Sequence, residues 1–120
     1  MNRDFNSFRV SINLSGTIFE TYLSTLQRFP TTLLGNRAKR KQYFCPQSQQ
    51  YFFPRSRIFF DAILFFYQSG GILRRPHGFP YELFAEECRF FQLPEDAILK
   101  AKPKTLKAHN KNRIDSKMLI

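Results

Sequence analysis

The sequence of 120 residues contains no tryptophan, five glycines and only two cysteines. Cys45 and Cys88 are too few for a disulfide framework, so we expect two reduced thiols. Zinc sites need closely spaced ligands, but His77, His109 and the cysteines lie far apart along the chain, and we expect no metal. The longest apolar run, residues 62–67, is too short to cross a bilayer. The N-terminus also lacks the apolar stretch of a secretion signal, which predicts a cytosolic protein.

Catalytic signatures are missing as well. There is no Gly-x-Gly-x-x-Gly or Walker loop, and Gly70-Gly71 follows an expected helix, where it would end that helix. Neither histidine has a nucleophile at a defined spacing. Glu86-Glu87 and Glu95-Asp96 are adjacent acids, which point in different directions on a helix, so we interpret both pairs as solvated surface. The sequence therefore predicts neither an enzyme nor a bound cofactor.

Acidic residues are scarce, and the net charge is +10. Residues 100–120 hold seven basic and one acidic side chain, whereas residues 1–99 hold twelve and eight, so most of the excess is C-terminal. The chain from Lys102 is lysine-rich with few apolar residues, which predicts a disordered tail. A second basic cluster spans residues 37–41, where we expect a solvated loop. Binding of nucleic acid or acidic lipid through this cluster and the tail is a remote alternative, and no nucleic-acid partner is expected.

Aromatic residues, in contrast, are abundant. Fifteen of the twenty Phe and Tyr side chains fall between residues 43 and 91, which locates the core there. Phe59, Ile63 and Phe66 form an apolar series at positions i, i+4 and i+7. Phe60, Leu64 and Tyr67 form a second series with the same spacing, shifted by one residue. This pattern predicts a central helix that is apolar around most of its circumference and ends at Gly70-Gly71.

The other segments predict an α+β domain with a small sheet flanked by short helices. We expect a hairpin of strands 8–15 and 18–22 with a turn at Gly16, followed by a short helix capped by Ser24 or Thr25, a turn of helix at 31–35, and strands 42–45 and 50–53. The central helix should have Ser56 as its N-cap, and Arg57 is spaced to pair with Asp61. A helix over 81–93 with Pro80 as its first residue and a helical turn at 95–99 should follow. The apolar side of the helix over 81–93 should comprise Phe84, Cys88 and Phe91, joined by Leu83.

Nine segments in a fixed order carry a resemblance to a known family. They are Val10–Gly16, Phe19-Glu20-Thr21, Thr25-Leu26, Phe29–Gly35, Tyr51-Phe52-Phe53, Phe60–Leu64, Tyr67–Gly71, Leu73–Pro76 and Glu86–Leu93. The order resembles the cytoplasmic N-terminal tetramerisation domain of Shaker-type voltage-gated potassium channels, which has a BTB/POZ-like fold. We therefore divide the chain into an N-terminal arm (1–7), a tetramerisation domain (8–99) and a basic tail (100–120).

The resemblance implies a four-fold ring in which each domain offers one polar face to its neighbour. The positions that match the family's interface are Asn13 and Thr21 on the hairpin, and Arg55 and Arg57 before the central helix. The implied partners are further copies of the chain, related potassium-channel subunits and a channel β-subunit. The implied location is the cytoplasmic face of a membrane.

The chain departs from the family pattern near this face. Pro54 stands where the family has an acidic residue, Ile58 and Phe59 replace a proline and a small polar residue, and Ile18 replaces an arginine. Pro54 would remove a backbone donor and a charge, and incompletely buried Ile58 and Phe59 would form an apolar patch. A basic tail also stands where the channels continue into membrane helices. The alternative function is therefore a free-standing BTB-type adaptor or channel regulator without pore and voltage sensor. If the chain is a channel domain, we expect it to join full-length subunits and suppress them.

Overall fold

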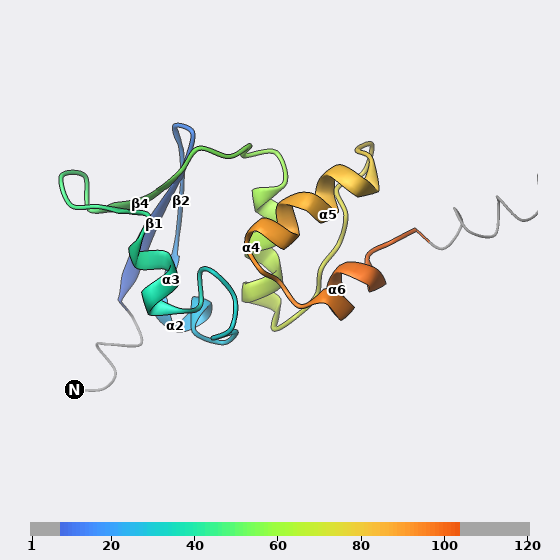
Figure 1. Cartoon of the computed structure of the whole chain (residues 1–120), viewed down its shortest axis with the longest axis horizontal. Helices are drawn as coiled ribbons and strands as arrows, with labels where there is room; N and C mark the ends of the chain where they lie inside the picture. Colours follow the sequence, from blue (N-terminus) through green and yellow to red (C-terminus); the bar gives the residue numbers. More distant parts are fainter. Residues whose placement is uncertain (1–7, 104–120) are drawn as a thin grey trace, which may run out of the picture.

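The structure, a computed structural model, describes residues 8–103. A four-stranded sheet packs against helices on one of its faces (Figure 1), which confirms the expected α+β class. In chain order the elements are β1 (Arg9–Leu14), β2 (Thr17–Tyr22), α2 (Leu23–Leu26), α3 (Arg37–Lys41), β3 (Phe44–Cys45), β4 (Gln50–Phe53), α4 (Phe60–Ser69), α5 (Tyr81–Phe90) and α6 (Glu95–Lys100). The expected arm at residues 1–7 and the part of the tail from residue 104 onward lie outside the described residues.

The sheet has the strand order β2-β1-β4-β3. β1 is antiparallel to β2 and parallel to β4, and β3 is antiparallel to β4. The β1–β2 turn needs two positive φ angles, 50° at Ser15 and 107° at Gly16, so the glycine supplies conformational freedom there. Side-chain alternation turns Ile12, Leu14 and Phe53 toward the helices, and all three are fully buried. The predicted hairpin and the strand over 50–53 are confirmed, whereas the strand predicted over 42–45 is shorter and comprises only Phe44–Cys45.

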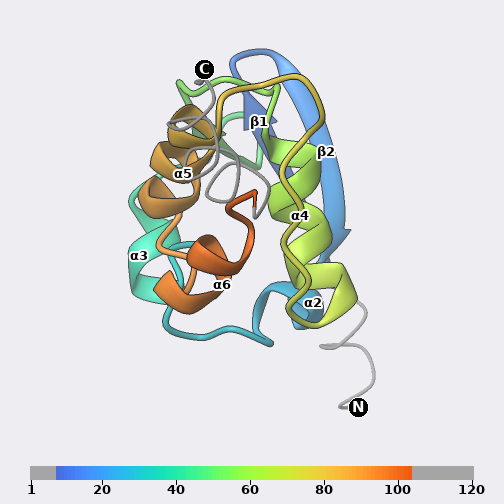
Figure 2. The ribbon, with the colours of Figure 1, turned by 90° about the vertical axis from the view of Figure 1, so that its right-hand side faces the viewer.

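α4 is the predicted central helix. All six side chains of the two apolar series are 7% exposed or less, so the helix is buried around most of its circumference. Figure 2 shows α4 beside α5 and in front of the sheet. The helix ends where Gly70 adopts a left-handed φ of 82°, as expected. Its predicted N-cap is wrong, because the helix begins at Phe60 and the Ser56 hydroxyl instead accepts a hydrogen bond from the Ile58 N–H at 3.1 Å.

α2 begins earlier than predicted. The helix starts at Leu23, directly after β2, so Ser24 and Thr25 lie inside it and neither is its N-cap. Tyr22 is the N-cap and makes no side-chain capping bond. The Leu23 N–H at the start of the helix instead donates to the carbonyl of Phe8 at 2.7 Å. This backbone bond satisfies the donor without a capping side chain.

The basic segment 37–41 is a helix, α3, and the prediction of a solvated loop there is wrong. The Asn36 side chain accepts a hydrogen bond from the Lys39 N–H at 3.0 Å, which caps the first turn. The segment is also not fully solvated. Arg40 is only 4% exposed, and its Nη1 donates to the Leu34 carbonyl at 3.0 Å.

α5 is confirmed in its core and corrected at its ends. Phe84 and Cys88 are fully buried as expected, but Leu83 is 50% exposed and does not belong to the apolar side. The helix ends at Phe90, three residues before the predicted end, because the chain turns at Gln92 with a φ of 60°. Pro80 is the N-cap, with an extended ψ of 137°, and not the first helical residue.

A buried hydroxyl, that of Thr32, is one of the groups that fix the chain between α2 and α3 to α4. Thr32 Oγ1 donates to the Phe29 carbonyl at 2.7 Å, and it accepts from the Tyr67 hydroxyl at 2.6 Å and from the Gly35 N–H at 3.0 Å. Gly35 is close to the same backbone, and a Cβ built on it would lie 1.9 Å from the Phe29 oxygen. The position therefore excludes any side chain, for reasons of space.

We expect Gly35→Ala to lower the free energy of unfolding by about 3 kcal/mol or more, because the added methyl group collides with backbone that cannot move without breaking the Thr32 contacts. Gly16→Ala is the matched control, since its Cβ meets nothing within 4 Å and costs only about 1–2 kcal/mol of left-handed strain. Urea unfolding followed by circular dichroism measures both. Equal losses for the two variants would contradict the close packing at Gly35.

A second prediction concerns alkaline pH. Burial, with a smaller contribution from the Glu87 carboxylate, raises the pKa of the Cys88 thiol from its ordinary 9.0 to about 12. Above pH 9 the unfolded chain therefore releases a proton that the folded chain retains, so stability falls as pH rises through this window. The slope attributable to Cys88 approaches about 1.4 kcal/mol per pH unit.

Cys88→Ala should remove this slope, although the cavity it leaves lowers stability at every pH. Cys45→Ala is the control, because hydrogen bonds from Ser48 lower the pKa of that thiol. Urea unfolding of each variant from neutral pH to about pH 10.5 gives the comparison. An unchanged alkaline slope in Cys88→Ala would refute the assignment.

Candidate functional site

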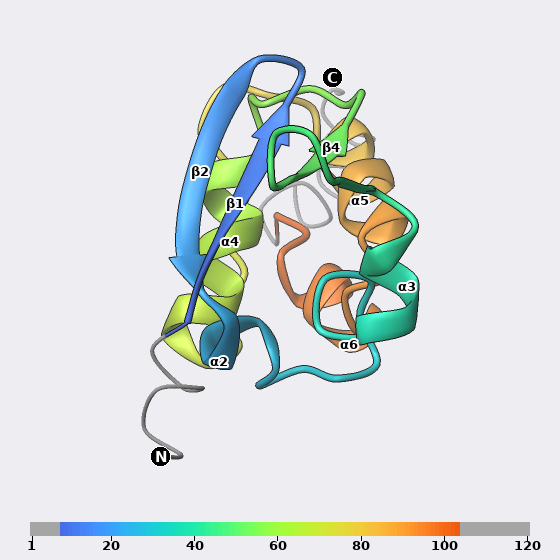
Figure 3. The ribbon, with the colours of Figure 1, turned by 90° about the vertical axis from the view of Figure 1, so that its left-hand side faces the viewer.

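The face of the sheet turned away from the helices is uncovered in the described part of the chain (Figure 3). We call it the open sheet face, and strand alternation and register place on it Arg9, Ser11, Asn13, Ile18, Glu20, Tyr22, Gln50 and Phe52. Three of its large side chains are strongly exposed, Ile18 at 50% and Tyr22 and Phe52 at 44% each. Apolar side chains exposed among polar groups are typical of protein interaction surfaces.

Asn13 lies on this face next to the hairpin turn. Its Oδ1 accepts from the Gly16 N–H at 2.7 Å, which fixes the hairpin turn, and its Nδ2 donates to Gln50 Oε1 at 3.1 Å. The side chain therefore joins β1 to β4 and is half-buried within its own chain. The remaining polar contacts of the face are exposed, such as the Arg9–Glu20 ion pair at 3.6 Å, and such pairs contribute little to stability.

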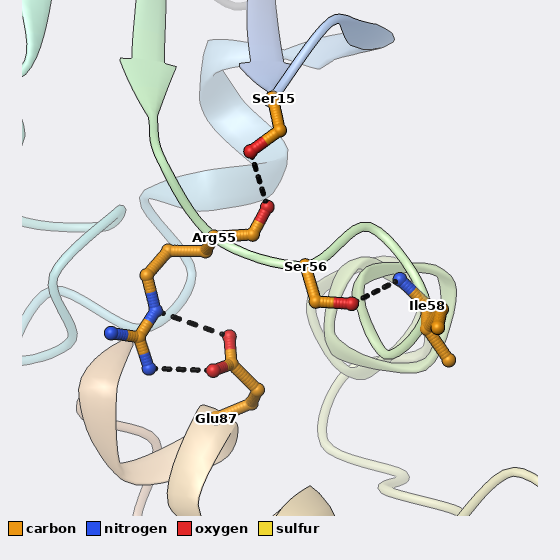
Figure 4. Close-up of polar contacts among 5 residues, drawn as sticks. All are labelled: Ser15, Arg55, Ser56, Ile58 and Glu87. Carbon is orange, nitrogen blue, oxygen red and sulfur yellow. Dashed lines mark hydrogen bonds and ion pairs between the residues drawn. The ribbon is translucent and has the colours of Figure 1, made fainter.

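Arg55 lies in the segment between β4 and α4, and Figure 4 shows its guanidinium pointing at Glu87 of α5. Arg55 Nη2 lies 2.5 Å from Glu87 Oε2, and Nε lies 3.4 Å from Oε1. The guanidinium carbon also lies 4.0 Å from the centroid of the Phe90 ring. The pair is mostly shielded, with side-chain exposures of 31% for Arg55 and 14% for Glu87. This geometry makes the contact stronger than an exposed ion pair.

The expectation that Glu87 belongs to the solvated surface is therefore wrong. Arg55 and Glu87 are 32 residues apart in the sequence. No local spacing could have indicated their contact. The carbonyl of Arg55 is held as well, because it accepts from the Ser15 hydroxyl at 2.9 Å (Figure 4). These contacts fix the segment after β4 to both the hairpin turn and α5.

The four residues predicted for the interface do not lie together. Ser15 of the hairpin turn bonds to the chain after β4, which brings Asn13, Arg55 and Arg57 to one edge of the sheet. Thr21 pairs with Val10 near the other end of the hairpin, about 10 Å away along the strand, and it is only 8% exposed. Its side chain also points to the face opposite that of Asn13.

Arg57 differs from the other three. It is exposed, and its side chain makes no hydrogen bond or ion pair within residues 8–103. The expected pairing with Asp61 is absent there because α4 begins only at Phe60, so the helical spacing does not apply.

The neighbouring residues that depart from the family pattern, Pro54, Ile58 and Phe59, differ in how deeply they are buried. Phe59 is 7% exposed and packs edge-on against Phe79 and obliquely against Phe84, at centroid distances of 5.5 and 5.7 Å. Ile58 is 49% exposed, and Pro54 is also exposed. The possible apolar patch is therefore reduced to Ile58, because the core accommodates Phe59.

The described residues contain no group of three or more His, Cys, Asp or Glu side chains placed to hold a metal ion. No helix in that part of the chain combines the length and apolarity needed to span a membrane.

Comparison with known proteins assigns the family. A BTB/POZ domain family model matches residues 10–101. Potassium voltage-gated channel subfamily A member 4 of Homo sapiens is 56% identical over 92 residues, which are 77% of this chain and 14% of the relative. Subfamily A member 2 of Xenopus laevis is 58% identical over 90 residues, and that of Mus musculus 57% over 90 residues, in each case 75% of this chain and 18% of the relative.

The chain thus spans less than one fifth of the length of these relatives, which are named as channel subunits. The matched region coincides with the described sheet and helices, from β1 to the end of α6. The chain belongs to the BTB/POZ domain family, in the branch whose relatives are voltage-gated potassium channel subunits of subfamily A.

Proposed function

We propose that this chain is the cytoplasmic assembly domain of a Shaker-type potassium channel, which forms a tetramer with copies of itself or with related channel subunits. The observation that supports this most strongly is the 56–58% identity to subfamily A channel subunits over nearly the whole described domain. The open sheet face supports it as well, because it combines exposed apolar and polar side chains. The proposed location is the cytoplasmic face of the membrane.

In the proposed ring, each subunit offers one surface to a different surface of its neighbour, which closes after four copies. Of the predicted interface residues, Arg57 and Asn13 are the ones we assign to direct contacts. Arg57 is exposed with its charge unpaired in the described chain, and Asn13 lies on the open sheet face. Arg55 is a positioning residue, because its charge is already paired with Glu87. Thr21 would contribute at the far end of the hairpin.

A free-standing BTB-type adaptor is the second candidate. It is favoured by Ile18, Pro54 and Ile58, which are exposed near the edge that carries Arg57. Pro54 has no N–H to donate, and the two isoleucines have no polar group to offer a neighbour. If these side chains disrupt polar contacts between subunits, the domain would stay monomeric or dimeric.

The first prediction here concerns assembly itself. Light scattering coupled to size exclusion, over a series of concentrations of the full chain, should give a tetramer. Arg57→Glu should weaken assembly about tenfold or more, because it places a charge of the wrong sign at the contact. Lys100→Glu is the control, since it makes the same charge change on α6, away from the proposed contact, and should leave the mass unchanged.

A monomer or dimer at every concentration of the unchanged chain would favour the adaptor. An Arg57→Glu chain that assembles as well as the unchanged chain would remove Arg57 from the interface.

The second prediction separates a positioning role of Arg55 from direct contact. If Arg55 acts through Glu87, Arg55→Ala and Glu87→Ala should each lower the free energy of unfolding by about 1–2 kcal/mol. The double variant should lose less than the sum of the two, because both single changes remove the same contact. Urea unfolding measures the three values. A tetramer that is lost in Arg55→Ala but intact in Glu87→Ala would show that Arg55 contacts the neighbouring subunit instead.

A further inference from the structure

A cavity of about 570 Å³ opens on the helix-facing side of the sheet, between the strands and helices α2 and α3. Its apolar wall includes Val10 of β1, Phe44 of β3 and Tyr51 of β4, which share one face of the sheet by register. Figure 3 shows α2 and α3 beside the end of the sheet where this cavity lies. Sites for small molecules typically have volumes of roughly 300–1,000 Å³ and mostly apolar walls.

The opposite wall is basic. It consists of Arg37, Arg40 and Lys41 of α3, and none of the described residues that line the cavity is acidic. Within residues 8–103, none of the three takes part in an ion pair. Three uncompensated positive charges over an apolar surface create a strong preference for an anion.

Arg40 is the buried member of this basic wall. Its side chain is buried, with an exposed fraction of 4%, and Nη1 donates to the Leu34 carbonyl. Its Nε has no hydrogen-bond partner. Among the described residues, no other buried side-chain nitrogen or oxygen lacks one. Burying a charge without a partner of opposite sign is costly, so arginine is a poor choice at this position for stability alone.

We propose that this cavity binds a small amphipathic carboxylate. The apolar body of the ligand would lie against Val10, Phe44 and Tyr51, and its carboxylate would lie beside the basic side chains of α3. A guanidinium group matches a carboxylate well, because two N–H groups can donate in parallel to its two oxygens. An anion with an apolar body would contact both walls at once, whereas a free inorganic anion would make no contact with the apolar wall.

The site does not depend on the proposed assembly function. Val10 and Asn13 point to opposite faces of β1, so the cavity and the open sheet face lie on different sides of the sheet. A ligand in the cavity would therefore leave the proposed subunit contacts free, and loss of assembly would not by itself abolish binding.

The test titrates the full chain with decanoate, followed by calorimetry and by amide NMR shifts. Decanol, which keeps the chain without the charge, and inorganic phosphate, which keeps a charge without the chain, are the two comparison ligands. We expect decanoate to bind with one site per chain, to shift the amides of Val10, Phe44 and Tyr51, and to bind at least about tenfold more tightly than either comparison ligand. Equal affinity for decanol and decanoate, or shifts confined to other parts of the chain, would overturn the proposal.

Variants localise the charge. Lys41→Glu should weaken decanoate binding about tenfold or more, while Lys100→Glu, which makes the same change outside the cavity, should not alter it. Arg40→Met keeps the bulk of the side chain and removes its charge. We expect it to weaken binding by a similar factor while urea unfolding shows stability equal to or above that of the unchanged chain. Unaltered affinity in Lys41→Glu, or a folded Arg40→Met chain that binds as before, would refute the site.

Discussion

The packing of α4 between the sheet and α5 is the constraint on which the other features depend. The Phe60 ring contacts Phe19 of β2 and Phe91 after α5, at centroid distances of 4.9 and 5.3 Å, and Phe66 contacts Phe29 at 4.4 Å. Each such aromatic pair contributes about 0.5–1.5 kcal/mol beyond its buried area. Because these contacts hold the sheet and the helices in place, both ends of the segment between β4 and α4 are fixed, and a few polar contacts suffice to orient it.

The ion pairs show where the chain uses charge internally and where it leaves charge available. The Arg55–Glu87 pair is largely shielded and joins the segment after β4 to α5, whereas the Arg89–Glu95 pair is about half exposed on both sides and contributes little. Arg57, two residues beyond Arg55, is exposed and makes no ion pair in the described chain. The domain therefore fixes one arginine within itself and leaves the next one exposed.

The sequence predicted the fold well wherever periodicity was strong. The two apolar series between residues 59 and 67 predicted α4 and its burial, because a spacing of i, i+4 and i+7 places side chains on one side of an α-helix but not of a β-strand. α3 was missed because five residues with one cap carry too little pattern, and no periodicity indicates that Arg40 is buried and donates to the Leu34 carbonyl. The Arg55–Glu87 contact was missed because it joins residues that are far apart in the sequence. The candidate interface came from the family resemblance, and the structure separates Thr21 from the rest.

The most direct test of the account is whether this domain mixes with a related one. Equal amounts of this chain and of the matching region of a subfamily A member 2 channel subunit would be unfolded together, refolded and examined by native mass spectrometry. We expect a series of tetramers that contain both chains in all proportions, because the proposed assembly requires a contact surface that the two domains share. Tetramers of the related domain alone, with this chain left as monomer or dimer, would contradict the proposed assembly and would favour the adaptor.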